Sequence, residues 1–521
     1  MADSEPWVKQ IRKPPNNPPL SAIPRAGHAL AVLAGVTVSL AVRGYQFGRG
    51  NHHVYLLEPL RINDPSLLAG DWWTTQTLQY HRLFNEVAAV ALDLGIARPA
   101  FLVAHLTCAV VLHAAWLGIT RSLGGTVWSY LGGVALYHLM LAGYGLGFYA
   151  FLQDGGFLPS NVAAVAVLAG VAFWLRGRDL PAALLGAVAA VWHVNYGIAV
   201  VGAWAIYAGV SAWRDRSRCG WRPAALWPVV LLPTLWSLLP VLLADRGEGL
   251  DTATFVELYA QVRHPHHYAP LTWPAALWLT FLLPVAGAAF AWRRGGRTAA
   301  RDRAAWLVLA TLVVLLGALA FAGVWWVSPS LVQLSLWRLS VVPKLLTCTA
   351  CAIGLAWVLP RGRWRRPAVV AVTLLTIAAG LLLNRGGVLS AERPDAGIAE
   401  VAAWARANTP ADAVFLVPPG DGSFRLDARR AVVVNFKHVP QLASELPVWR
   451  ERMQAVLGEP LEADGRTFVQ RRADMEPTYR ARDPADLRAV ARRYGATYLI
   501  VPATEGALFT TADGRWSVVE P

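Results

Sequence analysis

The segment after the first apolar run contains residue types that transfer reactions use. His52 and His53 are followed by two single carboxylates, Asp64 and Asp71, beside tryptophans that suit a membrane interface. Apolar surroundings raise the pKa of a carboxylate, which can then act as a general base toward a hydroxyl group. We therefore predict Asp71 as a catalytic base, with Asp64 as the second choice, and the two histidines as substrate-binding residues.

These residues also have structural interpretations, which the sequence leaves open. Asp64 precedes Pro65 and Asp71 follows Gly70, and both arrangements are typical of the residue that caps the start of a helix. The two histidines also fit a solvated or interfacial position.

Two further polar clusters lie between later apolar runs. Asp154 precedes a pair of glycines, where it can contact a metal or a sugar phosphate, or belong to a plain turn. His264, Pro265, His266 and His267 place three imidazoles within four positions, and imidazoles bind divalent metals, although a solvated histidine-rich loop is the alternative. We predict Asp154, with His264 or His266, as ligands of a divalent metal such as Mg²⁺ or Mn²⁺, and Asp154 also as a substrate-binding residue.

Two cations interrupt the apolar run 334–359. Arg338 and Lys344 are expensive to place in a membrane, so they are either functional or reach to the interface. Arginine binds phosphate with two parallel hydrogen bonds, and the phosphate of a lipid carrier is a suitable counter-ion. We predict both as substrate-binding residues. In the same run, Cys348 and Cys351 are interpreted as packing residues and not as a redox or metal pair.

The composition indicates a membrane protein that carries these residues on its helices and loops. The chain has 521 residues, of which 55% are hydrophobic, and a mean hydropathy of +0.39. A spanning helix needs about 20 apolar residues. Eleven runs qualify: 27–47, 100–119, 127–150, 159–175, 180–194, 196–213, 225–243, 271–292, 304–325, 334–359 and 367–384. If 180–194 and 196–213 form one broken helix, the count is ten.

Arginines occupy every second gap between the runs. They cluster at 176–178, 214–222, 293–303 and 361–366, whereas the gaps 151–159 and 326–333 contain neither lysine nor arginine. Cytoplasmic loops carry such an excess, so the pattern favours eleven spans with a cytoplasmic N-terminus and an external C-terminus. The long first loop also contains arginines and obeys the pattern less well.

The net charge of +14 belongs to the membrane-flanking part of the chain. From residue 385 onward there are 18 basic and 18 acidic residues, so the C-terminal region is neutral. The excess therefore sets topology and meets anionic lipids, which argues against nucleic-acid binding.

The expected organisation has three parts. Residues 1–25 form a cytoplasmic tail, residues 26–384 a transmembrane domain with external loops 48–99 and 244–270, and residues 385–521 an external domain. In the last part, helices are predicted at 398–407, 447–457 and 484–494, and strands at 413–417, 431–436, 497–501 and 516–519. This alternation predicts a mixed sheet covered by helices. The fold class is thus an α-helical polytopic membrane protein with a C-terminal mixed α/β domain.

The arrangement resembles the GT-C superfamily of integral-membrane glycosyltransferases. The resemblance depends on the acidic first loop, Asp154 after the third helix, the basic residues of a late helix, and the tail phrases 404–416 and 494–501. Residues 424–425 and 430–437 look most like an uncharacterised bacterial membrane family. In this chain the first-loop acids stand singly and do not form the superfamily's Asp-Glu or Asp-x-Asp pairs.

The resemblance implies an enzyme of the bacterial inner membrane that moves a sugar from a polyprenyl-phosphate donor to an external acceptor. Asp71 would be the base, and Arg338, helped by Lys344, would stabilise the departing phosphate. The alternatives are a lipid or solute transporter and a non-catalytic envelope-assembly protein. The sugar, the acceptor and the oligomeric state are left open.

Overall fold

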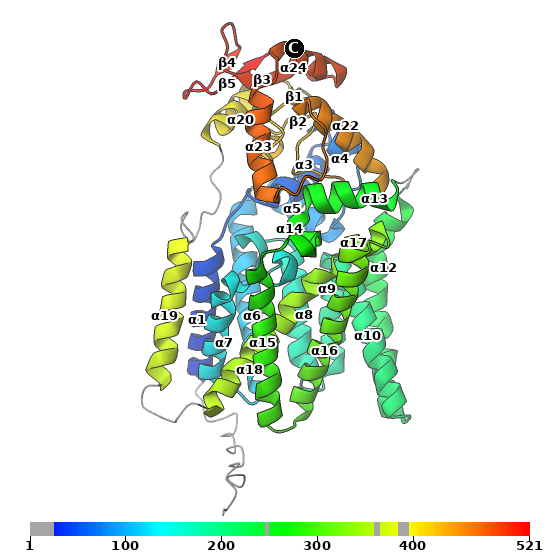
Figure 1. Cartoon of the computed structure of the whole chain (residues 1–521), viewed down its shortest axis with the longest axis vertical. Coiled ribbons are helices and arrows are strands. Elements are labelled where there is room, and N and C mark those ends of the chain that lie inside the picture. The colour runs from blue at the N-terminus through cyan, green and yellow to red at the C-terminus, as the bar shows by residue number, and fades with distance from the viewer. Residues whose placement is uncertain (1–24, 245–249, 359–364, 384–394) are drawn as a thin grey trace, which may run out of the picture.

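The computed structural model describes residues 25–244, 250–358, 365–383 and 395–521, which form a helical bundle with a smaller domain at one end (Figure 1). Each of the eleven predicted apolar runs contains a helix of the bundle. These helices are α1 (Arg25–Arg43), α6 (Ala97–Ser122), α7 (Val127–Leu139), α8 (Pro159–Trp174), α9 (Asp179–Trp192), α10 (Val194–Arg214), α12 (Trp227–Leu243), α15 (Ala275–Arg294), α16 (Ala299–Leu319), α18 (Val341–Val358) and α19 (Arg365–Leu383). The short helix α11 (Arg218–Ala225) precedes α12.

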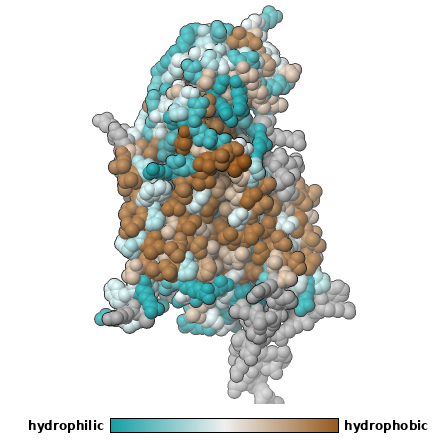
Figure 2. All heavy atoms as spheres, turned by 180° about the vertical axis from the view of Figure 1, so that it is seen from behind, coloured by the Kyte–Doolittle hydropathy of each residue, from teal (hydrophilic) through white to brown (hydrophobic). Residues whose placement is uncertain are grey.

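The bundle is that of a multi-pass membrane protein. Among the described helices, eight are long and apolar enough to span a membrane, or nine when the bent pair Leu146–Gly155 and Pro159–Trp174 counts as one span. Helix α9 is apolar but shorter, and α7 has 13 residues. On the face drawn in Figure 2, a broad apolar belt covers the bundle between two polar ends. The count of eleven spans remains a prediction.

Three of the arginine-rich gaps, 176–178, 214–222 and 293–303, lie at the end of the bundle away from the C-terminal domain (Figure 1). Arg176, after α8, donates a hydrogen bond of 2.9 Å to the Gly118 carbonyl near the end of α6. Arg303, near the start of α16, donates one of 2.7 Å to the Trp174 carbonyl at the end of α8. The guanidinium of Arg214, at the end of α10, lies 5.5 Å from the centre of an indole ring of α16. These arginine-rich gaps, which recur along the sequence, therefore gather at one end of the bundle.

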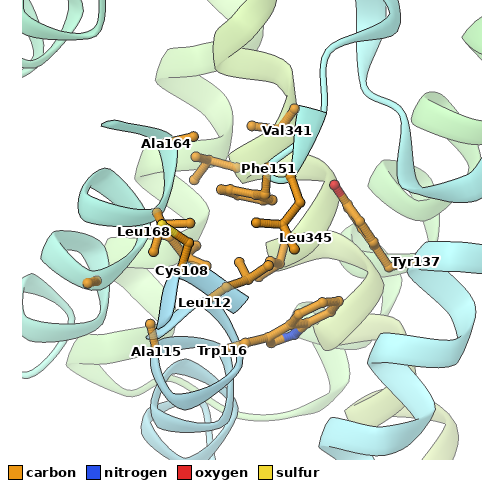
Figure 3. Packing of buried hydrophobic residues seen from close by; sticks show 14 of the residues in the cluster. Cys108, Leu112, Ala115, Trp116, Tyr137, Phe151, Ala164, Leu168, Val341 and Leu345 are labelled. Carbon is orange, nitrogen blue, oxygen red and sulfur yellow. The ribbon is translucent and has the colours of Figure 1, made fainter. Parts of the chain in front are cut away.

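The bundle core is packed by large apolar side chains from α6, α7, α8 and α18. Trp116 and Leu112 of α6 face Leu345 of α18 and Tyr137 of α7 in Figure 3. The indole nitrogen of Trp116 donates a 2.8 Å hydrogen bond to the Thr349 hydroxyl, which satisfies a buried polar group. Cys348 is fully buried in the same core, as expected of a packing residue.

The C-terminal domain is a mixed α/β structure, which confirms the predicted class. Its helices are α20 (Ala396–Asn408), α21 (Phe424–Ala428), α22 (Leu446–Leu457), α23 (Phe468–Arg480) and α24 (Pro484–Arg493). Its strands are β1 (Val414–Leu416), β2 (Ala431–Val432), β3 (Tyr498–Pro502), β4 (Phe509–Thr510) and β5 (Trp516–Val519). The strand order is β2-β1-β3-β5-β4, with β1 parallel to β2 and β3, and β5 antiparallel to β3 and β4. Helices α21 and α23 and strand β4 were not predicted.

Both long loops of the bundle fold against this domain. The first contains α2 (His52–Tyr55), α3 (Leu57–Asn63), α4 (Trp72–Gln76) and α5 (Arg82–Asp93), and the second α13 (Thr252–Phe255), the π-helix η5 (Val256–Arg263) and α14 (Pro265–Tyr268). Leu57, Trp73 and Leu258 from these loops share one hydrophobic cluster with Phe415 and Trp449 of the C-terminal domain. The loops and the domain are therefore one packed unit above the bundle.

Candidate functional site

A large cavity lies where the bundle, the two loops and the C-terminal domain meet. It encloses about 1330 Å³. Apolar side chains of the spanning helices α10 and α12 line one wall, and these are Ile198, Leu238, Val241 and Leu242. Among the described residues that line it, four are arginine or lysine, five are histidine, and Asp154 alone is acidic. A cavity of this composition suits an anionic ligand with an apolar portion.

Arg338 is the cation on the bundle side of this cavity. The left-handed turn at Ser335 (φ 54°) starts the short helix η8 (Leu336–Ser340), which carries Arg338 toward the cavity. Its Nε donates to the Ser335 hydroxyl at 3.1 Å, and its guanidinium lies 4.7 Å from the centre of the Tyr149 ring. No carboxylate of the described chain lies within ion-pair distance of it. The guanidinium therefore retains donors for a ligand anion.

Two histidines adjoin Arg338. An Nη of Arg338 lies 3.1 Å from His193 Nε2, and the His193 and His81 rings are 4.6 Å apart. Burial lowers the pKa of His81 to about 3, and the charge of Arg338 acts in the same direction. His81 is therefore neutral at pH 7, and its Nε2 is a buried nitrogen without a hydrogen-bond partner. Its left-handed backbone (φ 65°) is unusual for a residue other than glycine.

Asp154 faces the cavity from a strained turn between α7 and α8. Its φ of 55° is left-handed, and one carboxylate oxygen accepts a 3.2 Å hydrogen bond from the Asn51 amide. The following Gly155 packs so closely that an added Cβ would lie 2.7 Å from the Arg43 carbonyl oxygen. Burial raises the pKa of Tyr55 to about 12. The charge of Arg338 opposes this rise, and the charge of Asp154 adds to it. Asp154, Tyr55 and Arg338 all line this cavity.

Asp71 lies outside the cavity. Its carboxylate is completely buried, caps α4 through the Thr74 amide at 3.0 Å, and accepts 2.6 Å and 2.9 Å hydrogen bonds from Arg425 Nε and the Val432 amide. Both acceptor oxygens are thus used within the protein, and neither lines the cavity. This geometry does not fit the predicted general base, and we assign Asp71 to the docking of the first loop on the C-terminal domain. The capping alternative describes its observed bonds.

The other predicted base and the second predicted cation also lie away from the cavity lining. Asp64 is exposed after the end of α3, where hydrogen bonds from Ser66 lower the pKa of its carboxyl group below the usual value. Lys344 is buried, and its ammonium donates to the Met140 carbonyl at 2.7 Å and also to the Tyr144 carbonyl. Lys344 thus satisfies carbonyls of the segment that follows α7, and we replace its predicted phosphate-binding role by this structural one.

The histidine pair of the first loop is buried in the protein interior. His52 Nδ1 accepts from the Gly48 amide, and Nε2 donates to the Phe157 carbonyl, both at 3.0 Å. Burial lowers the pKa of His52 to about 4 and that of His53 to about 3. His53 lines a separate cavity of about 360 Å³. Neither histidine contacts the large cavity, so the predicted substrate contacts do not fit this site.

The histidines of the second loop do line the large cavity. His264 Nδ1 lies 3.0 Å from the Tyr259 carbonyl, and His266 Nδ1 is buried without a partner. Within the described residues, no three histidine, cysteine or acidic side chains converge as metal ligands. Among the described residues, the predicted set of Asp154, His264 and His266 is therefore not assembled.

Sequence reasoning did not select His81, His193 or Arg263 as site residues. His193 lies at the break between two apolar runs, which was the one signal available for it. Nothing in the local sequence distinguishes His81, because its position depends on the contact with α9 and α10.

The fold and this cavity define a polytopic membrane protein with a basic, ligand-sized cavity beneath an α/β domain. Residues 396–456 match a family model described as a domain of unknown function, DUF6798. No curated protein matches the chain.

Solved structures similar to the chain are membrane glycosyltransferases, the class that the sequence resemblance indicated. An oligosaccharyltransferase of Archaeoglobus fulgidus in complex with Zn and sulfate is 12% identical, with a TM-score of 0.47, over 92% of this chain and 68% of that one. The arabinofuranosyltransferase AftD from Mycobacteria is 18% identical, with a TM-score of 0.49, over 93% of this chain and 37% of that one. The archaeal oligosaccharyltransferase AglB in complex with an inhibitory peptide and a dolichol-phosphate is 12% identical, with a TM-score of 0.41, over 95% and 74%. At these identities and scores, the activity of this chain must be argued from its own residues.

Proposed function

We propose that the protein is a membrane glycosyltransferase that takes a sugar from a polyprenyl-phosphate donor in the large cavity. The observation that carries the proposal is the position of Arg338, a cation without a carboxylate partner in the described structure, in a cavity that apolar side chains of spanning helices also line. The apolar wall suits the lipid, and the guanidinium suits the phosphate. The positive-inside pattern supports an external acceptor and a C-terminal domain outside the cytoplasm of a bacterial inner membrane.

Asp154 is the residue that we assign as general base. It is the one carboxylate among the described cavity residues, and it shares Tyr55 as a neighbour with Arg338. In the proposed reaction, an acceptor hydroxyl oxygen bonds to the anomeric carbon of the sugar. The bond from that carbon to the phosphate oxygen breaks, Asp154 receives the hydroxyl proton, and Arg338 stabilises the charge left on the phosphate.

The first test measures binding of a radiolabelled polyprenyl-phosphate sugar to the purified full chain. Arg338→Met removes the charge and keeps an apolar stem, so we expect affinity to fall by about tenfold or more, because a charge-assisted hydrogen bond contributes about 1.5–3 kcal/mol. Lys344→Met is the matched control, since it removes a cation from the same spanning segment but outside the cavity lining. Equal loss of affinity in both variants, or in neither, would refute the role of Arg338.

The second test measures transfer of the label to an envelope fraction. Asp154→Asn keeps the shape of the side chain and removes the base, so we expect donor binding to persist while the transfer rate falls by about 10²–10⁴-fold. Movement of the labelled lipid across vesicles without sugar transfer would instead support the transporter alternative.

A further inference from the structure

A second group of basic side chains lines the same cavity on the side of the C-terminal domain. We define it as the second basic cluster: Arg263 at the end of η5, His266 in α14, and Lys437 of the C-terminal domain. Arg466 lines the same side, but two aspartates already pair with its guanidinium, at 2.5 Å and 2.9 Å. Arg466 is therefore not counted in the second basic cluster.

Arg263 is a buried guanidinium without a carboxylate partner in the described structure. It is 7% exposed, and one Nη donates to the Lys437 carbonyl at 3.0 Å, whereas its Nε has no partner. Its guanidinium also lies 5.1 Å and 5.2 Å from the ring centres of Phe436 and Phe468. Burial lowers the pKa of Arg263 to about 10, so it remains charged at pH 7. A buried charge of this kind needs an anion to offset its desolvation.

His266 supplies a second unsatisfied group beside Arg263. Its Nδ1 is buried without a hydrogen-bond partner, and its ring packs against Phe468 at 4.7 Å and His267 at 4.0 Å between ring centres. Leaving such a nitrogen unpaired is unfavourable, because it has lost its hydrogen bonds to water. A ligand oxygen at this position would accept a hydrogen bond from it and would also meet the guanidinium.

The second basic cluster and Arg338 belong to one continuous site. Burial raises the pKa of Tyr80, and the charges of Arg338 and Arg263 both oppose this rise. The Tyr80 hydroxyl is thus within the electrostatic reach of both guanidinium groups, and Tyr80 itself lines the cavity. Two cations without carboxylate partners at two sides of one cavity fit two anionic groups bound at the same time.

We propose that the second basic cluster binds a second anionic group, a phosphate or carboxylate, while Arg338 holds the donor phosphate. This inference depends on the proposed function only for the identity of the anion that Arg338 binds, the donor phosphate. The second anion has two possible sources: the outer phosphate of a diphosphate-linked lipid, or an acidic group on a separate acceptor molecule.

The experiment uses the purified full chain and two short lipids that differ by one phosphate. Farnesyl phosphate and farnesyl diphosphate carry the same tail, and we expect the diphosphate to bind about tenfold more tightly if the second anion belongs to the donor. In a second arm, inorganic phosphate is titrated into protein saturated with farnesyl phosphate, which detects a site for a separate anionic ligand.

Three variants connect either result to the structure. Arg263→Met should abolish the diphosphate preference, or the binding of inorganic phosphate, and leave farnesyl phosphate affinity unchanged. Arg263→Lys should restore part of the effect, which separates loss of charge from misfolding. Arg466→Gln is the matched control, because its charge is already paired, and should behave as the wild type.

The outcomes separate this inference from the proposed function. An Arg263-dependent effect in either arm supports the second anion site. The absence of both effects in the wild type, or their persistence in Arg263→Met, overturns it. Unchanged farnesyl phosphate affinity in Arg338→Met refutes the proposed function. The conclusion about the second anion site then still follows from the Arg263 variants alone.

Discussion

The Asp71–Arg425 ion pair gives the sharpest test of how the C-terminal domain is held. The two side chains are 0% and 1% exposed, and their contact of 2.6 Å joins the first loop to α21 of the domain. Asp71→Asn removes the charge and leaves Arg425 buried and uncompensated. Breaking a buried pair in this way costs about 3–5 kcal/mol. We therefore expect the free energy of unfolding to fall by about that amount.

The measurement is an SDS titration of the purified chain, combined with limited proteolysis of the C-terminal domain. Asp64→Asn is the matched control, because it removes an exposed acid from the same loop and should change the free energy of unfolding by less than about 0.5 kcal/mol. The double variant Asp71→Asn/Arg425→Met removes both charges. It should be less destabilised than the sum of the single variants by about 0.5–3 kcal/mol, the range for residues in contact.

The same variants decide between the docking role of Asp71 and the role of general base that was predicted from the sequence. A base replaced by asparagine loses transfer activity but leaves the fold intact. If Asp71→Asn abolishes transfer with an unchanged SDS midpoint and unchanged proteolysis, the docking role is refuted.

Three further perturbations test other parts of the structure. Gly155→Ala places a Cβ 2.7 Å from the Arg43 carbonyl oxygen, so it should displace the turn that holds Asp154 and reduce transfer more than donor binding in a radiolabel assay. Lys344→Met leaves two carbonyls unpaired and should lower the free energy of unfolding by about 1–3 kcal/mol in an SDS titration, with donor binding retained. His52 has a pKa of about 4 in the folded state, below the usual 6.5, so its contribution to stability is complete above pH 6.5 and is lost as the pH falls from 6.5 through 4. His52→Gln should therefore reduce the proton uptake on unfolding in this range by about one proton, measured from midpoints at several pH values; an unchanged pH dependence would contradict the assignment.

The sequence predicted the helices because they depend on local composition. All eleven apolar runs contain helices, and the arginines of 176–178 and 293–303 reach neighbouring helix ends on one side of the bundle. In the C-terminal domain, α24 lies within the predicted helix 484–494, and Asp483 caps it through a 2.7 Å hydrogen bond from the Ala485 amide. Short-range patterns of polarity and capping were sufficient for these elements.

The site was predicted less well because its residues meet through contacts that local patterns do not encode. In the sequence, Asp71 has the neighbours of a loop carboxylate near a membrane. Its burial depends on Arg425, which is 354 residues later in the chain. Lys344 was predicted to bind substrate because its acceptors, the Met140 and Tyr144 carbonyls after α7, lie 204 and 200 residues earlier in the chain. Arg338 and Asp154 do line the cavity, whereas the catalytic and binding roles of both remain predictions.

The position of Asp71 connects the docking of the domain to the chemistry of the cavity. Lys437 and Phe468 of the C-terminal domain line the cavity together with Arg338 of the bundle, so the two sides are complete only when the domain is docked. Loss of the ion pair should then weaken donor binding because fewer molecules have the C-terminal domain docked. The reaction in the docked molecules should be unchanged. In Asp71→Asn, donor affinity and protease resistance should fall together as temperature rises, and at low temperature both should approach wild-type values. A base would give the opposite result, with transfer lost at every temperature while the domain stays protected.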